Sequence, residues 1–251
     1  MPRPPHRGRR RTVRILVSIV AVLVLVLVGF LAWANTPMMG DRAAAIEVWT
    51  NPAVSITDEG DSVLLAPTGT PSGQGLVFIP GALVDPYAYL SKLAGAVEET
   101  GLTVVVTKPT LNLAFFDQRP LSTFTAHAPD VTSWYVGGHS LGGVRACQLA
   151  SDPAVDRLIL FGSYCANDLS GTALRVLSIG GSDDGLSTPA KIDAARHLLP
   201  ADATMVEIAG MNHAQFGDYG TQPGDSAPGI GDDEARTKVT DALTAFLGSA
   251  G

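Results

Sequence analysis

The chain has 251 residues, of which 46% are hydrophobic and 16% are charged, and its formal net charge is −7. Six of the 17 basic residues precede residue 15 and all 24 acidic residues follow residue 34, so residues 35–251 carry a net charge of −13. A domain this acidic argues against nucleic acid and anionic lipid headgroups as ligands.

The N-terminus has the composition of a membrane-targeting segment. Residues 1–14 contain six arginines and residues 15–34 contain no charge. Twenty helical residues span about 30 Å, the thickness of a hydrocarbon core. The arginines predict a cytoplasmic tail (1–14), a transmembrane anchor or signal segment (15–34) and an extracytoplasmic domain (35–251). The length of the apolar run favours a single-pass anchor, although Ala32-Trp33-Ala34 also fits a cleavage site, with secretion after cleavage near Ala34 as the alternative.

The remaining 217 or so residues suit one globular domain. Two short alternating segments, Ile46–Trp49 and Val63–Leu65, predict antiparallel strands near its start. From residue 76 onward, apolar strands alternate with helical patterns, which predicts a mostly parallel sheet covered by helices on both faces. The expected strands are 76–79, 102–106, 132–137, 157–161, 174–179 and 204–208, and the expected helices are 87–100, 144–150, 189–198 and 232–247.

The sequence Gly138-His139-Ser140-Leu141-Gly142 lies between the predicted strand 132–137 and the predicted helix 144–150. A strand that turns sharply into a helix with a serine at the turn is typical of a nucleophile elbow. The flanking glycines leave room for a strained turn and for the helix to pass close to the strand. Ser140 is therefore the candidate nucleophile.

A serine hydroxyl needs a base, and the base needs an orienting carboxylate. The loop after the strand 174–179 contains Asp183 and Asp184, and His213 follows the strand 204–208. We favour Asp184 over Asp183 as the acid from its spacing to Gly181. His213 is the only histidine that directly follows a late strand, whereas His139 is expected to be a packing residue because neighbours on a strand face opposite sides.

An oxyanion formed at the site would need two preorganised N–H donors. The first expected donor is the amide of Leu141, directly after the nucleophile. The second is the amide of Ala82, with Leu83 as the alternative, on the loop after the strand 76–79. No cluster of metal-ligating residues and no phosphate or dinucleotide motif is present in the sequence, so we expect no metal and no cofactor.

From about residue 45 to residue 247 the chain resembles the α/β-hydrolase superfamily, and within it the small bacterial dienelactone-hydrolase-like members with an N-terminal membrane segment. The resemblance rests on four stretches: 78–89 (FIPGALVDPYAY), 111–114 (LNLA), 137–143 (GGHSLGG) and 210–220 (GMNHAQFGDYG). It implies a triad of Ser140, Asp184 and His213 and hydrolysis of an ester-like bond through an acyl-enzyme. Dienelactone hydrolases use a cysteine nucleophile, so their lactone activity is not implied for a serine.

Three further features are open at this stage. Cys147 and Cys165 are expected on neighbouring elements, which permits a disulfide or two buried thiols. Only about a dozen residues separate Phe161 from Leu174, too few for a lid domain, which suggests an open site for small or polymer-borne esters. Residues 217–230 form a long stretch after His213 that could border the site or bind an ion, but a solvated surface loop is favoured.

The sequence thus predicts an exported serine hydrolase that cleaves carboxylic esters of small molecules or of the cell envelope. Two alternatives remain. One is an envelope acyltransferase that uses the same acyl-enzyme, and the other is a non-catalytic binding protein on the same fold.

Overall fold

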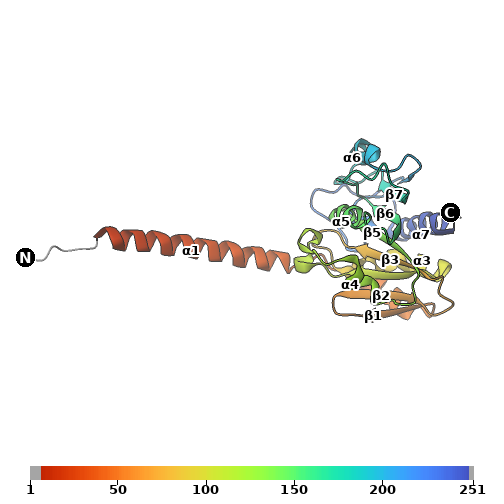
Figure 1. Cartoon of the computed structure of the whole chain (residues 1–251), viewed down its shortest axis with the longest axis horizontal. Helices are drawn as coiled ribbons and strands as arrows, with labels where there is room; N and C mark the ends of the chain where they lie inside the picture. Colours follow the sequence, from red (N-terminus) through yellow and green to blue (C-terminus); the bar gives the residue numbers. More distant parts are fainter. Residues whose placement is uncertain (1–6, 249–251) are drawn as a thin grey trace, which may run out of the picture.

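The computed structural model describes residues 7–248, in which one long helix projects from an α/β domain (Figure 1). The helix, α1 (Arg7–Ala34), includes a segment, Arg11–Ala34, that is mostly exposed and is long and apolar enough to cross a membrane. A signal sequence would meet the same criteria. The first six residues of the predicted basic tail lie outside the described residues.

The domain is built on an eight-stranded sheet with the order β1-β2-β4-β3-β5-β6-β7-β8. Strand β2 pairs antiparallel with β1 and β4, and all other pairs are parallel. The strands are β1 (Val54–Asp58), β2 (Ser62–Pro67), β3 (Gln74–Ile79), β4 (Thr103–Thr107), β5 (Ser133–His139), β6 (Val155–Phe161), β7 (Arg175–Gly181) and β8 (Thr204–Ile208). This arrangement confirms the predicted mostly parallel sheet.

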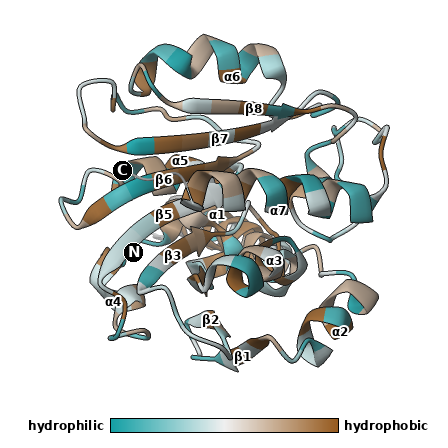
Figure 2. Ribbon diagram, turned by 90° about the vertical axis from the view of Figure 1, so that its right-hand side faces the viewer, coloured by the Kyte–Doolittle hydropathy of each residue, from teal (hydrophilic) through white to brown (hydrophobic). Residues whose placement is uncertain are grey.

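Helices cover both faces of the sheet, as Figure 2 shows. Alternate residues of the central strand β3 enter two separate cores, with Leu76 and Phe78 on one face and Val77 and Ile79 on the other. A strand buried on both faces is apolar at every position, which explains the continuous hydrophobic runs in the sequence. The first core contains α3 (Leu90–Thr100) and α7 (Asp232–Gly248), and the second contains α4 (Leu121–Thr125) and α5 (Leu141–Leu149).

Parallel strands bring their carboxyl ends to one edge of the sheet, where ligands bind in open α/β folds. The described residues between β6 and β7 contain no helix, so no lid domain covers this edge. The helix α6 (Pro189–Ala195) follows β7 and lies beside β8 at the end of the sheet (Figure 2).

The predicted strand Ile46–Trp49 is wrong, because these residues belong to the helix α2 (Arg42–Thr50). The side chain of Asp41 caps this helix by accepting a hydrogen bond from the amide of Ala44 at 2.9 Å. An N-cap followed by a run of alanines favours a helix, and the apparent alternation was too short to outweigh it.

The two cysteines are joined by a disulfide. Cys147 lies on the helix after the elbow and Cys165 follows β6, and both are buried. The bridge therefore fixes α5 to the loop beyond the neighbouring strand β6.

Candidate active site

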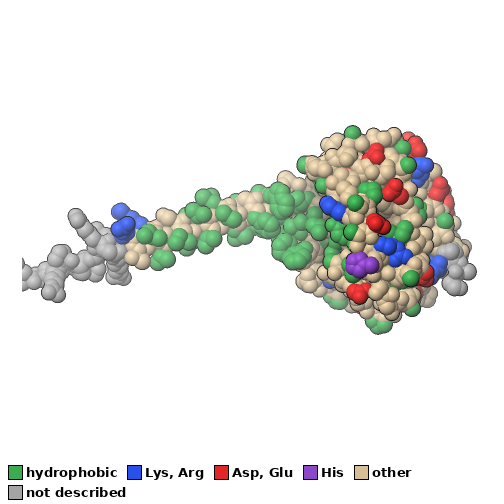
Figure 3. All heavy atoms as spheres, turned by 90° about the horizontal axis from the view of Figure 1, so that it is seen from above, with side chains coloured by type: hydrophobic (Ala, Val, Ile, Leu, Met, Phe, Trp, Pro, Cys, Tyr) green, Lys and Arg blue, Asp and Glu red, His purple; other side chains and the backbone are tan. Residues whose placement is uncertain are grey.

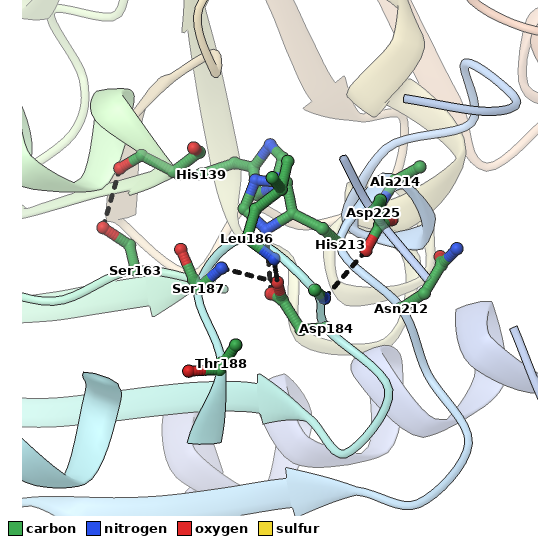
Figure 4. Close-up of polar contacts among 12 residues, drawn as sticks. His139, Ser163, Asp184, Leu186, Ser187, Thr188, Asn212, His213, Ala214 and Asp225 are labelled. Atoms are coloured by element: carbon green, nitrogen blue, oxygen red, sulfur yellow. Dashed lines mark hydrogen bonds and ion pairs between the residues drawn. The ribbon is translucent and has the colours of Figure 1, made fainter. Parts of the chain in front are cut away.

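Ser140 occupies a strained turn between β5 and α5. Its backbone angles are φ 52° and ψ −124°, a conformation that L-residues rarely adopt. Two hydrogen bonds hold the turn: the amide of Ser140 donates to the carbonyl of Phe161 at 3.1 Å, and the Ser163 hydroxyl donates to the Ser140 carbonyl at 2.7 Å (Figure 4). Ser140 is half-buried at the carboxyl end of β5.

The glycines on either side of Ser140 are required by close backbone approach. A Cβ atom on Gly142 would lie 2.1 Å from the carbonyl oxygen of Ile79 and 2.3 Å from that of Pro80. A Cβ atom on Gly138 would lie 2.5 Å from the carbonyl carbon of Gly142. The glycines thus let α5 pack directly against the end of β3 and the loop that follows it.

Asp184 and His213 form a buried hydrogen-bonded pair, shown in Figure 4. The His213 Nδ1 atom lies 2.8 Å from Oδ2 of Asp184, and neither side chain is exposed to solvent. The other carboxylate oxygen, Oδ1, accepts hydrogen bonds from the amides of Leu186 at 2.8 Å and Ser187 at 2.6 Å. These donors fix the carboxylate, which in turn fixes the plane of the imidazole.

The structure separates the two acids of this loop. Asp183 is half-exposed, and its carboxylate accepts a hydrogen bond from the neighbouring hydroxyl of Ser182. Asp184 is the acid that contacts His213. Within the described chain, the Nε2 atom of His213 has no hydrogen-bond partner. This ring nitrogen is therefore free to exchange a proton with another group.

Asp225 connects the two loops that carry this pair. Its Oδ1 atom accepts from the amide of Gly185, and its Oδ2 atom accepts from the amide of Ala214, both at 2.9 Å. Each donor is adjacent in sequence to one member of the Asp184–His213 pair. Asp225 was not predicted to hold the pair together, because a carboxylate in a long loop carries no signal of its partners.

The expected oxyanion donors follow two neighbouring strands, Ala82 after β3 and Leu141 after β5. Among the described residues, neither the amide of Ala82 nor that of Leu141 has a hydrogen-bond acceptor. The amide of Leu83, the alternative donor, is bonded to the carbonyl of Asn112 at 2.8 Å, and the amide of Gly81 donates to the Tyr89 hydroxyl at 2.8 Å. Ala82 is thus the available amide of this loop.

His139 is buried, as expected of a packing residue, but it also contacts the ring of His213 and the hydroxyl of Tyr89. Its ring is fully buried with its centroid 4.4 Å from that of His213, and its Nδ1 atom lies 2.9 Å from the Tyr89 hydroxyl. That hydroxyl accepts from Gly81, so its own proton is free to bond to Nδ1. Burial, and next the neighbouring charge of His213, lowers the pKa of His139 well below its usual value, which keeps this ring neutral.

The stretch after His213 is a solvated loop, as the sequence predicts, only in its second part. Residues 220–229 are mostly exposed, but Asp218 is buried. Its carboxylate lies 3.0 Å from Nζ of Lys92 and also accepts a hydrogen bond from the Ser91 hydroxyl. The first part of the stretch therefore anchors the site loop to α3. No group of three or more metal-ligating side chains occurs in the part of the chain that the structure describes.

A buried Asp–His pair, a serine in a strained elbow and two free amides thus lie at the carboxyl edge of a parallel sheet. The model of the alpha/beta hydrolase family matches residues 75–237, and the chain belongs to that family. No curated protein matches the sequence.

Several solved structures share the fold. A bacterial membrane phospholipase A is 15% identical with a TM-score of 0.53, and the match covers 96% of this chain and 100% of that one. A carboxylesterase from Bacillus subtilis is 10% identical with a TM-score of 0.55, covering 83% and 96%. A serine hydrolase without a lid from Xanthomonas campestris is 15% identical with a TM-score of 0.52, covering 80% and 98%. At these identities the likeness establishes the fold alone.

Proposed function

We propose that this protein is a membrane-anchored serine hydrolase that cleaves carboxylic esters outside the cytoplasm. The observation that carries the proposal is the buried hydrogen bond between Asp184 and His213 beside the strained serine elbow. A buried carboxylate bonded to an imidazole is the arrangement that orients a general base and stabilises its protonated form. The esterases among the structural neighbours support the same chemistry.

In the proposed reaction, the Ser140 oxygen attacks the acyl carbon while Nε2 of His213 takes the hydroxyl proton. The amides of Ala82 and Leu141 donate to the oxyanion, and each such donor typically contributes about 2.7–4 kcal/mol to transition-state stabilisation. The bond to the alcohol oxygen then breaks, and His213 returns its proton to that oxygen. Water then attacks the acyl carbon as His213 takes its proton. His213 gives that proton to the Ser140 oxygen as its bond to the acyl carbon breaks, which releases the acid and restores the serine hydroxyl.

The anchor is also part of the proposal. Ala34, the last residue of α1, is fully buried, and its carbonyl accepts a hydrogen bond from the Asn112 side chain at 2.9 Å. A helix whose last residue packs into the domain favours a retained anchor over a removed signal peptide. The match to the membrane phospholipase covers 96% of this chain, which is more than residues 35–251 make up. This coverage also supports a retained anchor. N-terminal sequencing of protein recovered from membranes tests it, and a mature start at Asn35 would contradict it.

The catalytic proposal is tested by labelling the purified full-length protein with a fluorophosphonate, which reacts only with activated serines. Labelling should be present in the wild type and lost in Ser140→Ala and His213→Ala. Ser170→Ala and His197→Ala are matched controls at exposed positions and should label like the wild type. No labelling of a folded wild type would favour a non-catalytic binding protein, and product analysis with an added alcohol would detect acyl transfer.

A further inference from the structure

A continuous row of aromatic rings joins the membrane helix to the domain. Ring centroids lie 5.9 Å apart between Trp33 and Phe30, 6.2 Å between Phe30 and Phe116, and 5.6 Å between Phe116 and Phe115. Exposed fractions are 52% for Trp33, 48% for Phe116 and 76% for Phe115. Figure 3 shows apolar side chains gathered where the helix meets the domain. We call Phe30, Trp33, Phe115 and Phe116 the aromatic row.

The length of α1 places this row at the membrane surface. The uncharged run ends at Ala34, and twenty such residues fill a hydrocarbon core of about 30 Å. Ala34 is already part of the domain, so no linker separates the domain from the end of the span. Phe30 lies four residues earlier, about 6 Å deeper along the helix axis. Phe116, whose ring contacts Phe30, therefore reaches the level of the acyl chains.

The candidate site lies on the same edge of the domain. The short 3₁₀ helix Ala114–Phe116 packs against α5, the helix that begins directly after Ser140. The first residue of α5, Leu141, is itself 49% exposed.

The loop with the second oxyanion donor is bonded to the same junction. The amide of Leu83 donates to the carbonyl of Asn112, and the side chain of Asn112 donates to the carbonyl of Ala34. The amide of Met38, four residues beyond the helix, donates to the carbonyl of Leu83 at 2.7 Å. The end of the membrane helix, the aromatic row and the loop of Ala82 thus form one connected structure.

We propose that the aromatic row seats the domain on the outer leaflet of the membrane crossed by α1, and that the site takes its substrates from ester lipids of that leaflet. This inference rests on the proposed function and specifies its substrate class. Aromatic side chains are favoured at the level where lipid headgroups meet the acyl chains, which is also where the ester bonds of glycerolipids lie. It differs from the sequence-based expectation of small or polymer-borne esters.

The charges of the domain indicate which lipid surface fits. Residues 35–251 carry a net charge of −13, so attraction to anionic headgroups is not available as a driving force. In Figure 3 the acidic side chains in view lie on the part of the domain away from the helix. Burial of apolar side chains must therefore drive the docking. We expect the domain to dock on a zwitterionic phosphatidylcholine bilayer, and we expect high salt not to release it.

Docking can be measured without any catalytic assay. Both native cysteines are bridged, so Phe115→Cys in the full-length protein provides a single free thiol for an environment-sensitive nitrobenzoxadiazole dye. In phosphatidylcholine nanodiscs, the dye at position 115 should be blue-shifted, quenched by lipids with a spin label on the acyl chain and protected from aqueous iodide. The matched control is Met205→Cys, which replaces an exposed apolar residue on β8. It should show the opposite pattern.

The substrate class is measured as a ratio of two activities in the same nanodiscs. One is turnover of a water-soluble short-chain nitrophenyl ester, and the other is release of a fluorescent acyl chain from phosphatidylcholine. In Phe115→Ser/Phe116→Ser, the ratio of lipid to soluble turnover should fall by about tenfold or more, because two aromatic rings leave the lipid. Met205→Ser should keep the wild-type ratio.

The outcomes separate the two proposals. A dye at position 115 that is quenched by iodide and not by lipid would overturn the docking surface. Turnover of the soluble ester without release of the lipid acyl chain would overturn the substrate class and leave the hydrolase proposal intact. Absence of both activities, with the dye in lipid, would refute the hydrolase proposal while the docking surface stands.

Discussion

Replacing Asp184 by asparagine changes one atom of the site and tests the central pair. The carbonyl oxygen of the new side chain would stay with the amides of Leu186 and Ser187, which donate to Oδ1 at 2.8 and 2.6 Å. The amide NH₂ would then replace Oδ2, 2.8 Å from Nδ1 of His213. Because an NH₂ group only donates, His213 would carry its proton on Nε2 and could no longer accept the proton of the serine.

The expected loss is about 10⁴-fold in kcat, the size of a wrong-tautomer effect in a serine protease, which corresponds to about 5.4 kcal/mol of activation free energy. Folding should be affected much less. The lost charge-assisted hydrogen bond contributes about 1.5–3 kcal/mol to stability, and the new amide contact recovers part of it. Activity should therefore fall by orders of magnitude in a protein that still unfolds cooperatively.

The assay is steady-state hydrolysis of a short-chain nitrophenyl ester by the full-length protein, with thermal unfolding followed in parallel. The matched control is Asp183→Asn, which alters the adjacent, half-exposed acid and should change kcat by less than about threefold. Equal losses in both variants would refute the assignment of Asp184. So would an Asp184→Asn variant with near-wild-type kcat.

Three further predictions concern the disulfide, the elbow glycine and His139. Cys147→Ser/Cys165→Ser should lower the free energy of unfolding by about 3 kcal/mol in denaturant titrations, because the bridge closes a loop with a sequence separation of 18. Free thiols in the unreduced wild type would contradict the bridge. Gly142→Ala should abolish activity or folding, since its Cβ would meet backbone oxygens at 2.1 and 2.3 Å. A Cβ on Gly171 has no neighbour within 4 Å, so Gly171→Ala should keep the wild-type ester turnover and melting temperature in the same assays. His139 has a lowered pKa in the folded protein, so the unfolded chain takes up more protons and the free energy of unfolding should fall as pH drops below about 6.5. His139→Asn should reduce that pH dependence in denaturant titrations at pH 7.5 and 5, and an unchanged slope would count against it.

The local sequence determined the elements with the strongest patterns. The strand at 204–208 was predicted with the bounds that the structure has, and the last helix was predicted to within one residue. Such segments need little tertiary context, because continuous apolar runs and helical periodicity reflect burial directly. The helix at 42–50 was missed because its single buried pair, Ala44 and Val48, leaves hardly any periodic signal.

The sequence also determined the candidate chemistry. A hydrolase is indicated by sequence features alone: the order of Ser140, Asp184 and His213 in the chain, and the glycines beside the serine. What it could not decide were contacts between residues far apart in the chain. The choice between Asp183 and Asp184 depended on which carboxylate reaches the imidazole, and that depends on the turn of one loop.

Tertiary structure alone decided the role of Asp225, the disulfide and the pairing of His139 with Tyr89. Each depends on how two loops or helices lie against each other, and no local pattern encodes that distance. The same holds for the aromatic row, whose two halves, 30–33 and 115–116, lie more than 80 residues apart in the chain and meet only because the end of α1 packs against the domain beside Asn112. The sequence specifies which groups are available, and the packing of the sheet and its loops determines which of them act together.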